Sequence, residues 1–215
     1  MDRIYKTYGR LLAETDLTFT RYLYEKINWD NRLIVIKGAK GVGKTTMLLQ
    51  HILRSFSDKT KALYVSLDNI WFVNHSVIDL AEYHYTHGGT HLLLDEVHKY
   101  KDWQQEIKNI YDSYPGLHII VTGSSMLRLE ESLMGDLSRR HRQYTLEGLS
   151  FREYLDLEQV IQLPVLSLDS ILNDHFMQAS QITSKVKVLQ HFEKYLQSGY
   201  YPFYREEGDG FFDRL

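Results

Sequence analysis

Cysteine is absent from the 215 residues, and proline occurs only three times. Without thiols the chain can form neither a disulfide nor a thiolate zinc site, and it has no cysteine nucleophile. A reducing compartment suits such a chain, so we expect a cytoplasmic protein. No apolar run approaches the length of a membrane span, and the start MDRIYKTYGR lacks the apolar stretch of a secretory signal. We therefore expect no membrane partner.

A strong charge of either sign is also missing, because 25 basic and 28 acidic residues leave a net charge of -3. The whole chain thus gives no electrostatic argument for a nucleic-acid partner, although a local basic patch would still be compatible with one. Hydrophobic residues make up 43% and charged residues 25% of the sequence, which is typical of a globular protein. The length suffices for one α/β domain with an appendage.

A glycine-rich segment follows the apolar residues 33–36 and precedes a helical pattern of apolar residues. Residues 38–45 fill the spacing G-x-x-x-x-G-K-[ST], whose glycines let backbone N–H groups approach the oxygens of a phosphate. We expect Lys44 to reach the β- and γ-phosphates of a nucleotide and the Thr45 hydroxyl to bind Mg²⁺. The residues predicted to bind the nucleotide are Gly38, Ala39, Lys40, Gly41, Val42, Gly43, Lys44, Thr45 and Thr46.

Strands and helices alternate through the first two thirds of the chain. Short apolar runs predict strands at 33–36, 62–67, 91–95, 117–122 and 143–146, and helical spacing predicts helices at 76–85 and 102–111. This alternation favours an α/β fold in which helices flank a parallel, doubly wound sheet. Residues 1–30 predict two amphipathic helices, the second beginning near Thr15 or Asp16. Ser150 and Glu153 predict a capping box, with helices at 169–180 and 184–197 after it.

Two adjacent carboxylates end the predicted strand at 91–95, about fifty residues after the glycine-rich segment. We expect Asp95 to hold Mg²⁺ through water and Glu96 to orient or deprotonate an attacking water. At the end of the next strand, either Thr122 or Ser124 could position that water or sense the γ-phosphate, because ligands of parallel sheets lie at the carboxyl ends of the strands. These hydroxyls could equally cap the following helix.

A basic run, Arg139 to Arg142, precedes the last predicted strand. One of its arginines could stabilise transition-state charge across a subunit boundary, which would require a homo-oligomer. The run could also be a solvated basic turn. His84, His87 and His91 have a spacing that could suggest a metal, but no cysteine or pair of carboxylates accompanies them. We interpret them as loop and strand-edge residues.

The motifs together resemble P-loop ATPases of the additional-strand type, with a Walker A loop and a Walker B strand. More closely, the chain resembles the AAA+-related ATPases of bacteria and archaea whose core is followed by a domain of unknown function. The resemblance is carried by GAKGVGKTT at 38–46, YVSLDN at 64–69, LLLDEVHK at 92–99, IIVTGSS at 119–125, SRR at 138–140, YTLEGLSFREYL at 144–155 and GYYPFY at 199–204.

This resemblance implies that the strand at 117–122 inserts between the loop strand and the acidic strand. It implies ATP or ADP as ligand with Mg²⁺, bound by Lys44, Thr45 and Asp95, and Glu96 as catalytic base. It places the sensor at 122–124, with Ser124 as a catalytic candidate, and matches Arg140 to the arginine of the group, although Arg139 stands where a glycine is usual. We expect a helical brace at 1–30, the ATPase core at 31–150 and a helical lid at 151–215, before a further domain.

Three functions fit these residues. The first is an ATPase whose turnover drives a conformational cycle. The second is a nucleotide-gated binding module with little hydrolysis, which would have no need of Glu96 as a water-orienting carboxylate. The third is a helicase, because residues 95–98 also spell D-E-x-H. The chain is short for two motor lobes and shows no basic-aromatic track for nucleic acid. The sequence does not identify a protein or nucleic-acid partner.

Overall fold

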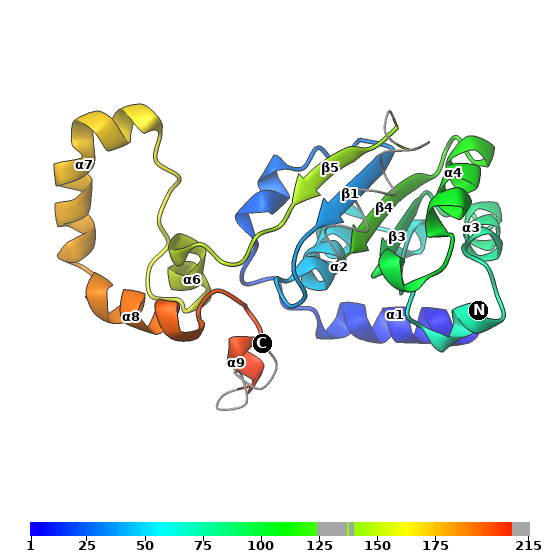
Figure 1. Ribbon diagram of the computed structural model, residues 1–215, viewed down its shortest axis with the longest axis horizontal. Helices are drawn as coiled ribbons and strands as arrows, with labels where there is room; N and C mark the ends of the chain where they lie inside the picture. Colours follow the sequence, from blue (N-terminus) through cyan, green and yellow to red (C-terminus); the bar gives the residue numbers. More distant parts are fainter. Residues whose placement is uncertain (124–136, 138–139, 208–215) are drawn as a thin grey trace. The chain divides into compact units, whose positions relative to one another are not determined.

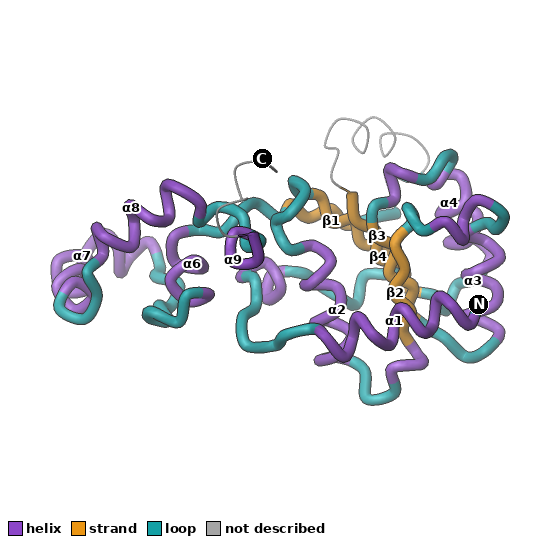
Figure 2. The backbone as a smooth tube through the Cα atoms, turned by 90° about the horizontal axis from the view of Figure 1, so that it is seen from below, coloured by secondary structure: helices purple, strands orange, loops and turns teal. Residues whose placement is uncertain are grey.

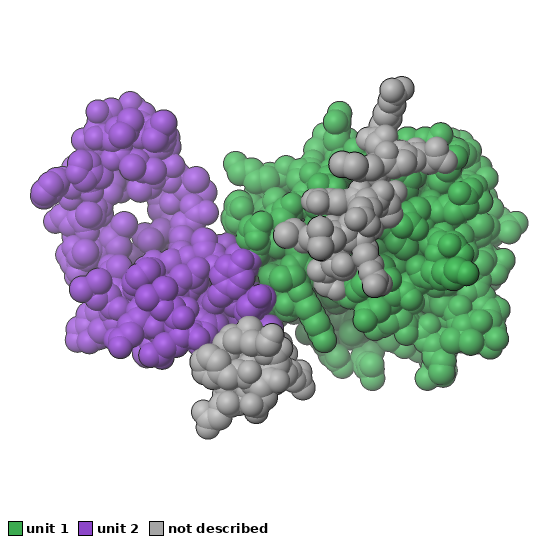
Figure 3. Space-filling view, in the orientation of Figure 1, with its two compact units in different colours: residues 1–147 green, residues 148–215 purple. Residues whose placement is uncertain are grey.

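The computed structural model is described here for residues 1–123, 137 and 140–207 (Figure 1). Ser124 and Arg139 therefore lie outside the described residues. The chain divides into two compact units, residues 1–147 and 148–215 (Figure 3). Within the described residues, no helix combines the length and the apolar character needed to cross a membrane.

The first unit is built on a five-stranded sheet with the order β2-β3-β4-β1-β5. The strands are β1 Leu33–Lys37, β2 Ala62–Ser66, β3 His91–Asp95, β4 His118–Gly123 and β5 Arg142–Thr145. All four strand pairs are parallel. β4 lies between β1 and β3, so the predicted insertion of the fourth strand is confirmed. All five residues of β1 are buried, which explains why its first four residues form a continuous apolar run.

Helices cover both faces of this sheet, as Figures 1 and 2 show. α1 packs against α2 and β2 on one face, and α3 packs against α4 on the other. Right-handed crossovers between parallel strands require this arrangement, because the chain reverses direction across the sheet at β2. The helices of this unit are α1 Asp2–Glu14, α2 Lys44–Ser55, α3 Val77–Thr86 and α4 Trp103–Ser113. The predicted α/β fold is thus confirmed.

The second helix predicted before β1 is wrong. In place of a helix that starts near Thr15 or Asp16, the chain has an irregular segment and one short 3-10 turn, η1 Tyr22–Lys26. Side chains of α2 hold this segment: Gln50 Nε2 donates hydrogen bonds to the backbone oxygens of Asp16 and Phe19, at 2.7 and 2.8 Å. These side-chain bonds satisfy the two backbone carbonyls without a helical ladder, so the segment can stay irregular.

The regular elements of the second unit, where it is described, are helices. It contains α6 Phe151–Leu157, α7 Leu168–Thr183, α8 Val188–Ser198 and α9 Tyr204–Glu207. The predicted capping box is confirmed, because Ser150 and Glu153 exchange side-chain to backbone hydrogen bonds at the start of α6. The two C-terminal motifs pack on each other: Leu149 N–H donates to Tyr200 O, and the Tyr195 hydroxyl donates to Leu149 O, both at 2.7 Å.

Histidines gather at the amino ends of β3 and β4. The rings of His91 and His118 stack with centroids 4.6 Å apart, and Phe56 meets both His91 and His51 edge-on. Burial is the largest cause that lowers the pKa of His51 and of His91 to about 4 each. The ring nitrogen Nε2 of His84 lies 3.0 Å from the backbone carbonyl oxygen of His91. The described residues contain no group of three or more histidine, cysteine, aspartate or glutamate side chains that could hold a metal ion. The metal interpretation of these histidines is therefore not supported.

Acid should destabilise the first unit through this histidine cluster. The unfolded pKa is near 6.5 and the folded values are about 4, so the unfolded chain binds more protons between these limits. The stability that these neutral histidines contribute is therefore fully present above pH 6.5 and is lost as the pH falls toward 4. Allowing for solvent screening, we expect urea unfolding to show a loss on the order of 1 kcal/mol per histidine between pH 7 and 5. His91→Gln should reduce this slope, whereas His175→Gln, at an exposed position, should not. An unchanged slope in His91→Gln would contradict the assignment.

Candidate nucleotide-binding site

The glycine-rich loop joins the carboxyl end of β1 to the first residue of α2. Gly41 and Gly43 have φ angles of 85° and 93°, a region that side chains with a Cβ rarely adopt. A Cβ on Gly38 would collide with the carbonyl oxygen of Leu146, which follows β5. Leu146 N–H in turn donates to Lys37 O at 2.7 Å. Glycine is therefore required at all three positions to give a loop with closely packed backbone.

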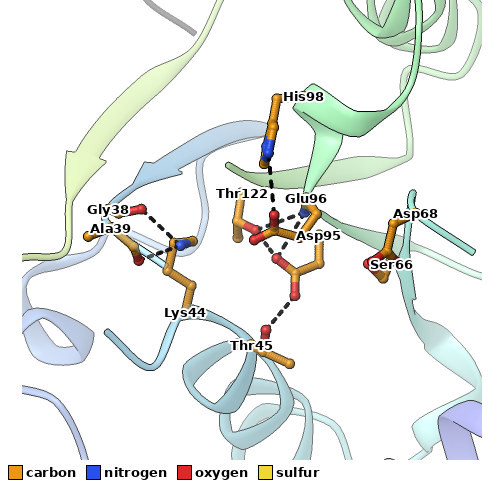
Figure 4. A network of polar contacts seen from close by, with 10 residues as sticks. All are labelled: Gly38, Ala39, Lys44, Thr45, Ser66, Asp68, Asp95, Glu96, His98 and Thr122. Atoms are coloured by element: carbon orange, nitrogen blue, oxygen red, sulfur yellow. Dashed lines mark hydrogen bonds and ion pairs between the residues drawn. The ribbon is translucent and has the colours of Figure 1, made fainter. Parts of the chain in front are cut away.

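Lys44 is held inside this loop, with only 4% of its surface exposed. Its Nζ donates to the carbonyl oxygens of Gly38 and Ala39, both at 2.9 Å (Figure 4). Burial lowers the pKa of Lys44, and the carboxylates of Glu96 and Asp95 act in the opposite direction. An anion in the loop would relieve this desolvation, because it offers the ammonium a full charge in place of two carbonyl dipoles.

Asp95 is the centre of a buried hydrogen-bond network at the carboxyl end of β3. It is 2% exposed. One carboxylate oxygen accepts from the Thr45 hydroxyl at 2.5 Å and from the Tyr64 hydroxyl at 2.8 Å. The other accepts from the Thr122 hydroxyl and, at 3.0 Å, from Glu96 N–H. Donors from α2, β2, β4 and the residue after β3 therefore fix this carboxylate, and Figure 4 shows three of them, Thr45, Glu96 and Thr122.

Glu96 follows Asp95 with a φ of 53°, in the left-handed region. This conformation is uncommon for a residue with a side chain, and it turns the chain sharply into the 3-10 turn at Val97–Lys99. The Glu96 side chain is 23% exposed, and its Oε2 lies 3.5 Å from His98 Nε2. Asp95 and Glu96 thus have different surroundings: the first is buried and fully bonded, whereas the second reaches the solvent-accessible side of the loop.

Arg140 does not join this group of residues within its own chain. It precedes β5, and the register pairs Arg142 with Ile34 near the start of β1, so it belongs to the end of the sheet opposite the loop. Its Nη1 lies 2.9 and 2.8 Å from the two carboxylate oxygens of Asp112 in α4. The structure therefore brings Lys44, Thr45, Asp95, Glu96 and Thr122 together and leaves Arg140 apart.

Two residues of the site were not predicted from the sequence. Tyr64 lies in an apolar strand and reads as core, and only the pairing of β2 with β3 shows that its hydroxyl meets Asp95. Burial and the Asp95 charge raise the pKa of Tyr64, so the phenol stays protonated as a donor. Arg21 is 4% exposed and donates to the backbone oxygens of Val42 and Glu147. A buried arginine next to the loop has no local sequence signal.

The donor set suits a nucleotide with Mg²⁺. The loop offers closely packed backbone where side chains would collide, and the buried ammonium of Lys44 offers a counter-charge. Thr45 and Asp95 present adjacent oxygens, which are the ligands that Mg²⁺ prefers, and nucleotide phosphates usually complete the coordination of this ion.

A comparison with protein families identifies the core. Residues 30–155 match a family model described as an AAA domain. The chain belongs to this AAA domain family. Membership places it among the AAA-type P-loop nucleotide-binding ATPases, in agreement with the parallel sheet and the glycine-rich loop.

The chain also resembles a longer protein, "Uncharacterized protein MJ1637" of Methanocaldococcus jannaschii. The two are 31% identical over 226 residues, and the match covers 92% of this chain and 47% of that protein. The chain thus spans about half the length of that protein.

Two solved structures show weaker likenesses. PCH-2 of C. elegans has a TM-score of 0.43 at 17% identity, over 78% of this chain and 50% of that one. The S. cerevisiae Hsp104–ADP complex has a TM-score of 0.48 at 17% identity, over 70% and 25%. The family assignment rests on residues 30–155 and not on these two structures.

Proposed function

We propose that this AAA domain binds ATP with Mg²⁺ and hydrolyses it in a conformational cycle. The observation that supports the proposal is the convergence of Lys44, Thr45, Asp95 and Glu96 on one end of the sheet. Lys44 would hold the β- and γ-phosphates, and Thr45 and Asp95 would hold Mg²⁺. The ion would neutralise charge on the phosphates.

Glu96 would act on the water that attacks the γ-phosphate. Its carboxylate is partly exposed next to the buried network. The hydrogen bond from Glu96 to Asp95 is made by the backbone N–H, so the carboxylate can accept a proton from a water without breaking that bond. Thr122 would help to keep this geometry, since its hydroxyl bonds Asp95 and lies 3.4 Å from Glu96 N–H. A module that only binds nucleotide would need neither the Glu96 carboxylate nor its separation from the metal-binding carboxylate.

Phosphate release tests this function directly. We expect the purified chain to release phosphate from ATP in the presence of Mg²⁺ and to lose this activity when EDTA removes the ion. GTP should be the poorer substrate, because the sequence has no guanine-reading N-K-x-D motif. Nucleotide binding by calorimetry, with no phosphate release above the buffer rate, would favour the switch over the ATPase.

We also propose that Arg140 serves the nucleotide of a neighbouring copy of the chain. Its position at the opposite end of the strands and its contact with Asp112 support this role, because it cannot serve its own loop from there. An arginine that stabilises transition-state charge is worth at least about 10³-fold in rate, so we expect Arg140→Ala to slow turnover roughly 10³-fold or more.

A concentration series checks the trans arrangement. The specific rate of the wild type should rise with protein concentration, and that of Arg140→Ala should stay low. Arg142→Ala removes an exposed arginine two residues further on and should behave as the wild type. A constant specific rate from a protein that light scattering shows to be a monomer would contradict the proposal.

A further inference from the structure

Arg21 is a buried cation next to the phosphate loop, in the irregular segment that precedes η1. Removing a guanidinium from water is strongly unfavourable unless its donors are satisfied. Nη1 donates to Val42 O, and Nη2 donates to Glu147 O at 2.7 Å. Both of these acceptors are backbone atoms, so the arginine fixes the course of the chain at two places.

The first of these places lies inside the loop. Val42 stands between Gly41 and Gly43, which adopt positive φ angles because glycine has no Cβ. The peptide between Val42 and Gly43 is planar and trans, so its N–H points away from its C=O. When Arg21 binds the carbonyl of Val42, it therefore aims the N–H of Gly43 in the opposite direction.

The second place is the segment that leaves β5. Leu146 N–H donates to Lys37 O, and the Leu146 carbonyl packs against Gly38 at the beginning of the loop. Glu147, the next residue, accepts from Arg21. Leu146 thus fixes the beginning of the loop at Gly38. Arg21 links Glu147 to Val42, near the end of the loop.

We propose that Arg21 is a positioning residue of the phosphate loop, which directs the Gly43 N–H toward the phosphates of a bound nucleotide. This inference rests on the nucleotide binding proposed above. The role requires the fork of the guanidinium, because one flat group must donate to two carbonyls that belong to different segments. The positive charge alone would not fix the orientation of a peptide.

Two substitutions separate orientation from charge. Arg21→Gln removes both the charge and the fork, whereas Arg21→Lys keeps the charge and loses the fork. Arg54→Gln is the matched control, since Arg54 ties the same segment to α2 through Leu17 O and the Thr20 hydroxyl. Dissociation constants for ADP and for adenosine would be measured on the full chain by calorimetry and saturation-transfer NMR, with thermal melting to check the fold.

We expect both Arg21 variants to bind ADP roughly tenfold or more weakly, a loss of one or more hydrogen bonds to phosphate, while adenosine binds as in the wild type. The control should bind ADP normally. Wild-type ADP affinity in folded Arg21→Gln would overturn the inference, and so would an equal loss for ADP and adenosine. If Arg21→Gln does not fold, wild-type ADP affinity in Arg21→Lys overturns it. Absence of ADP binding by the wild type itself would instead refute the proposed nucleotide binding.

Discussion

Lys44→Ala should raise the dissociation constant for ATP roughly 100-fold or more. The ammonium is the buried cation of the loop, and hydrogen bonds to a charged partner contribute roughly 1.5–3 kcal/mol each, so two of them account for this factor. Calorimetric titration of the variant with ATP and Mg²⁺ would measure the change. The substitution also removes the hydrogen-bond donor that Lys44 Nζ offers to the carbonyls of Gly38 and Ala39.

Lys40→Ala is the natural control, because Lys40 has the same charge, lies in the same loop and is exposed. We expect this variant to lose at most a small part of the affinity, since exposed charges are screened by solvent and salt. Circular dichroism would establish that both variants keep the fold. If Lys44→Ala binds ATP as tightly as Lys40→Ala, the loop does not hold the phosphates and the assignment of the site is wrong.

Glu96→Gln should separate binding from turnover. The amide keeps the size of the side chain and leaves the Glu96 N–H bond to Asp95 in place, but it cannot accept a proton from water. General-base catalysis contributes typically 10²–10⁴-fold, so we expect turnover to fall by at least roughly 100-fold while the ATP dissociation constant stays within about threefold. Phosphate release and calorimetry on the same preparation would measure the two quantities.

Asp102→Asn provides a comparison at a nearby surface carboxylate, whose side chain is 72% exposed. It should leave both quantities unchanged. Turnover at the wild-type rate in Glu96→Gln would remove Glu96 from the mechanism. Loss of ATP binding in the same variant would give this residue a structural role in the loop.

The phosphate loop and the acidic pair could be predicted because both are local in the sequence. A strand, a glycine loop and a helix must follow one another for residues 38–46 to make their contacts, and Asp95 and Glu96 end a strand whose apolar character is evident. The meeting of Thr45 with Asp95 then follows from any parallel sheet in which β1, whose loop leads to Thr45, and β3 end at the same edge.

Tyr64 and Arg21 could not be predicted in this way. The role of Tyr64 depends on the register that pairs it with Leu93 and Ser66 with Asp95, and periodicity within one strand carries no information on its neighbour. The segment of Arg21 has helical spacing but no helix, because α2 side chains bind its carbonyls. The roles of Tyr64 and Arg21 both depend on contacts between segments that are far apart in the sequence.

Glu147 is tied to the phosphate loop through Arg21, which has a consequence for any ligand that contacts residues 146–147. A bound nucleotide that displaced this segment would change the affinity for such a ligand. By thermodynamic reciprocity, the ligand would change the affinity for nucleotide by the same factor.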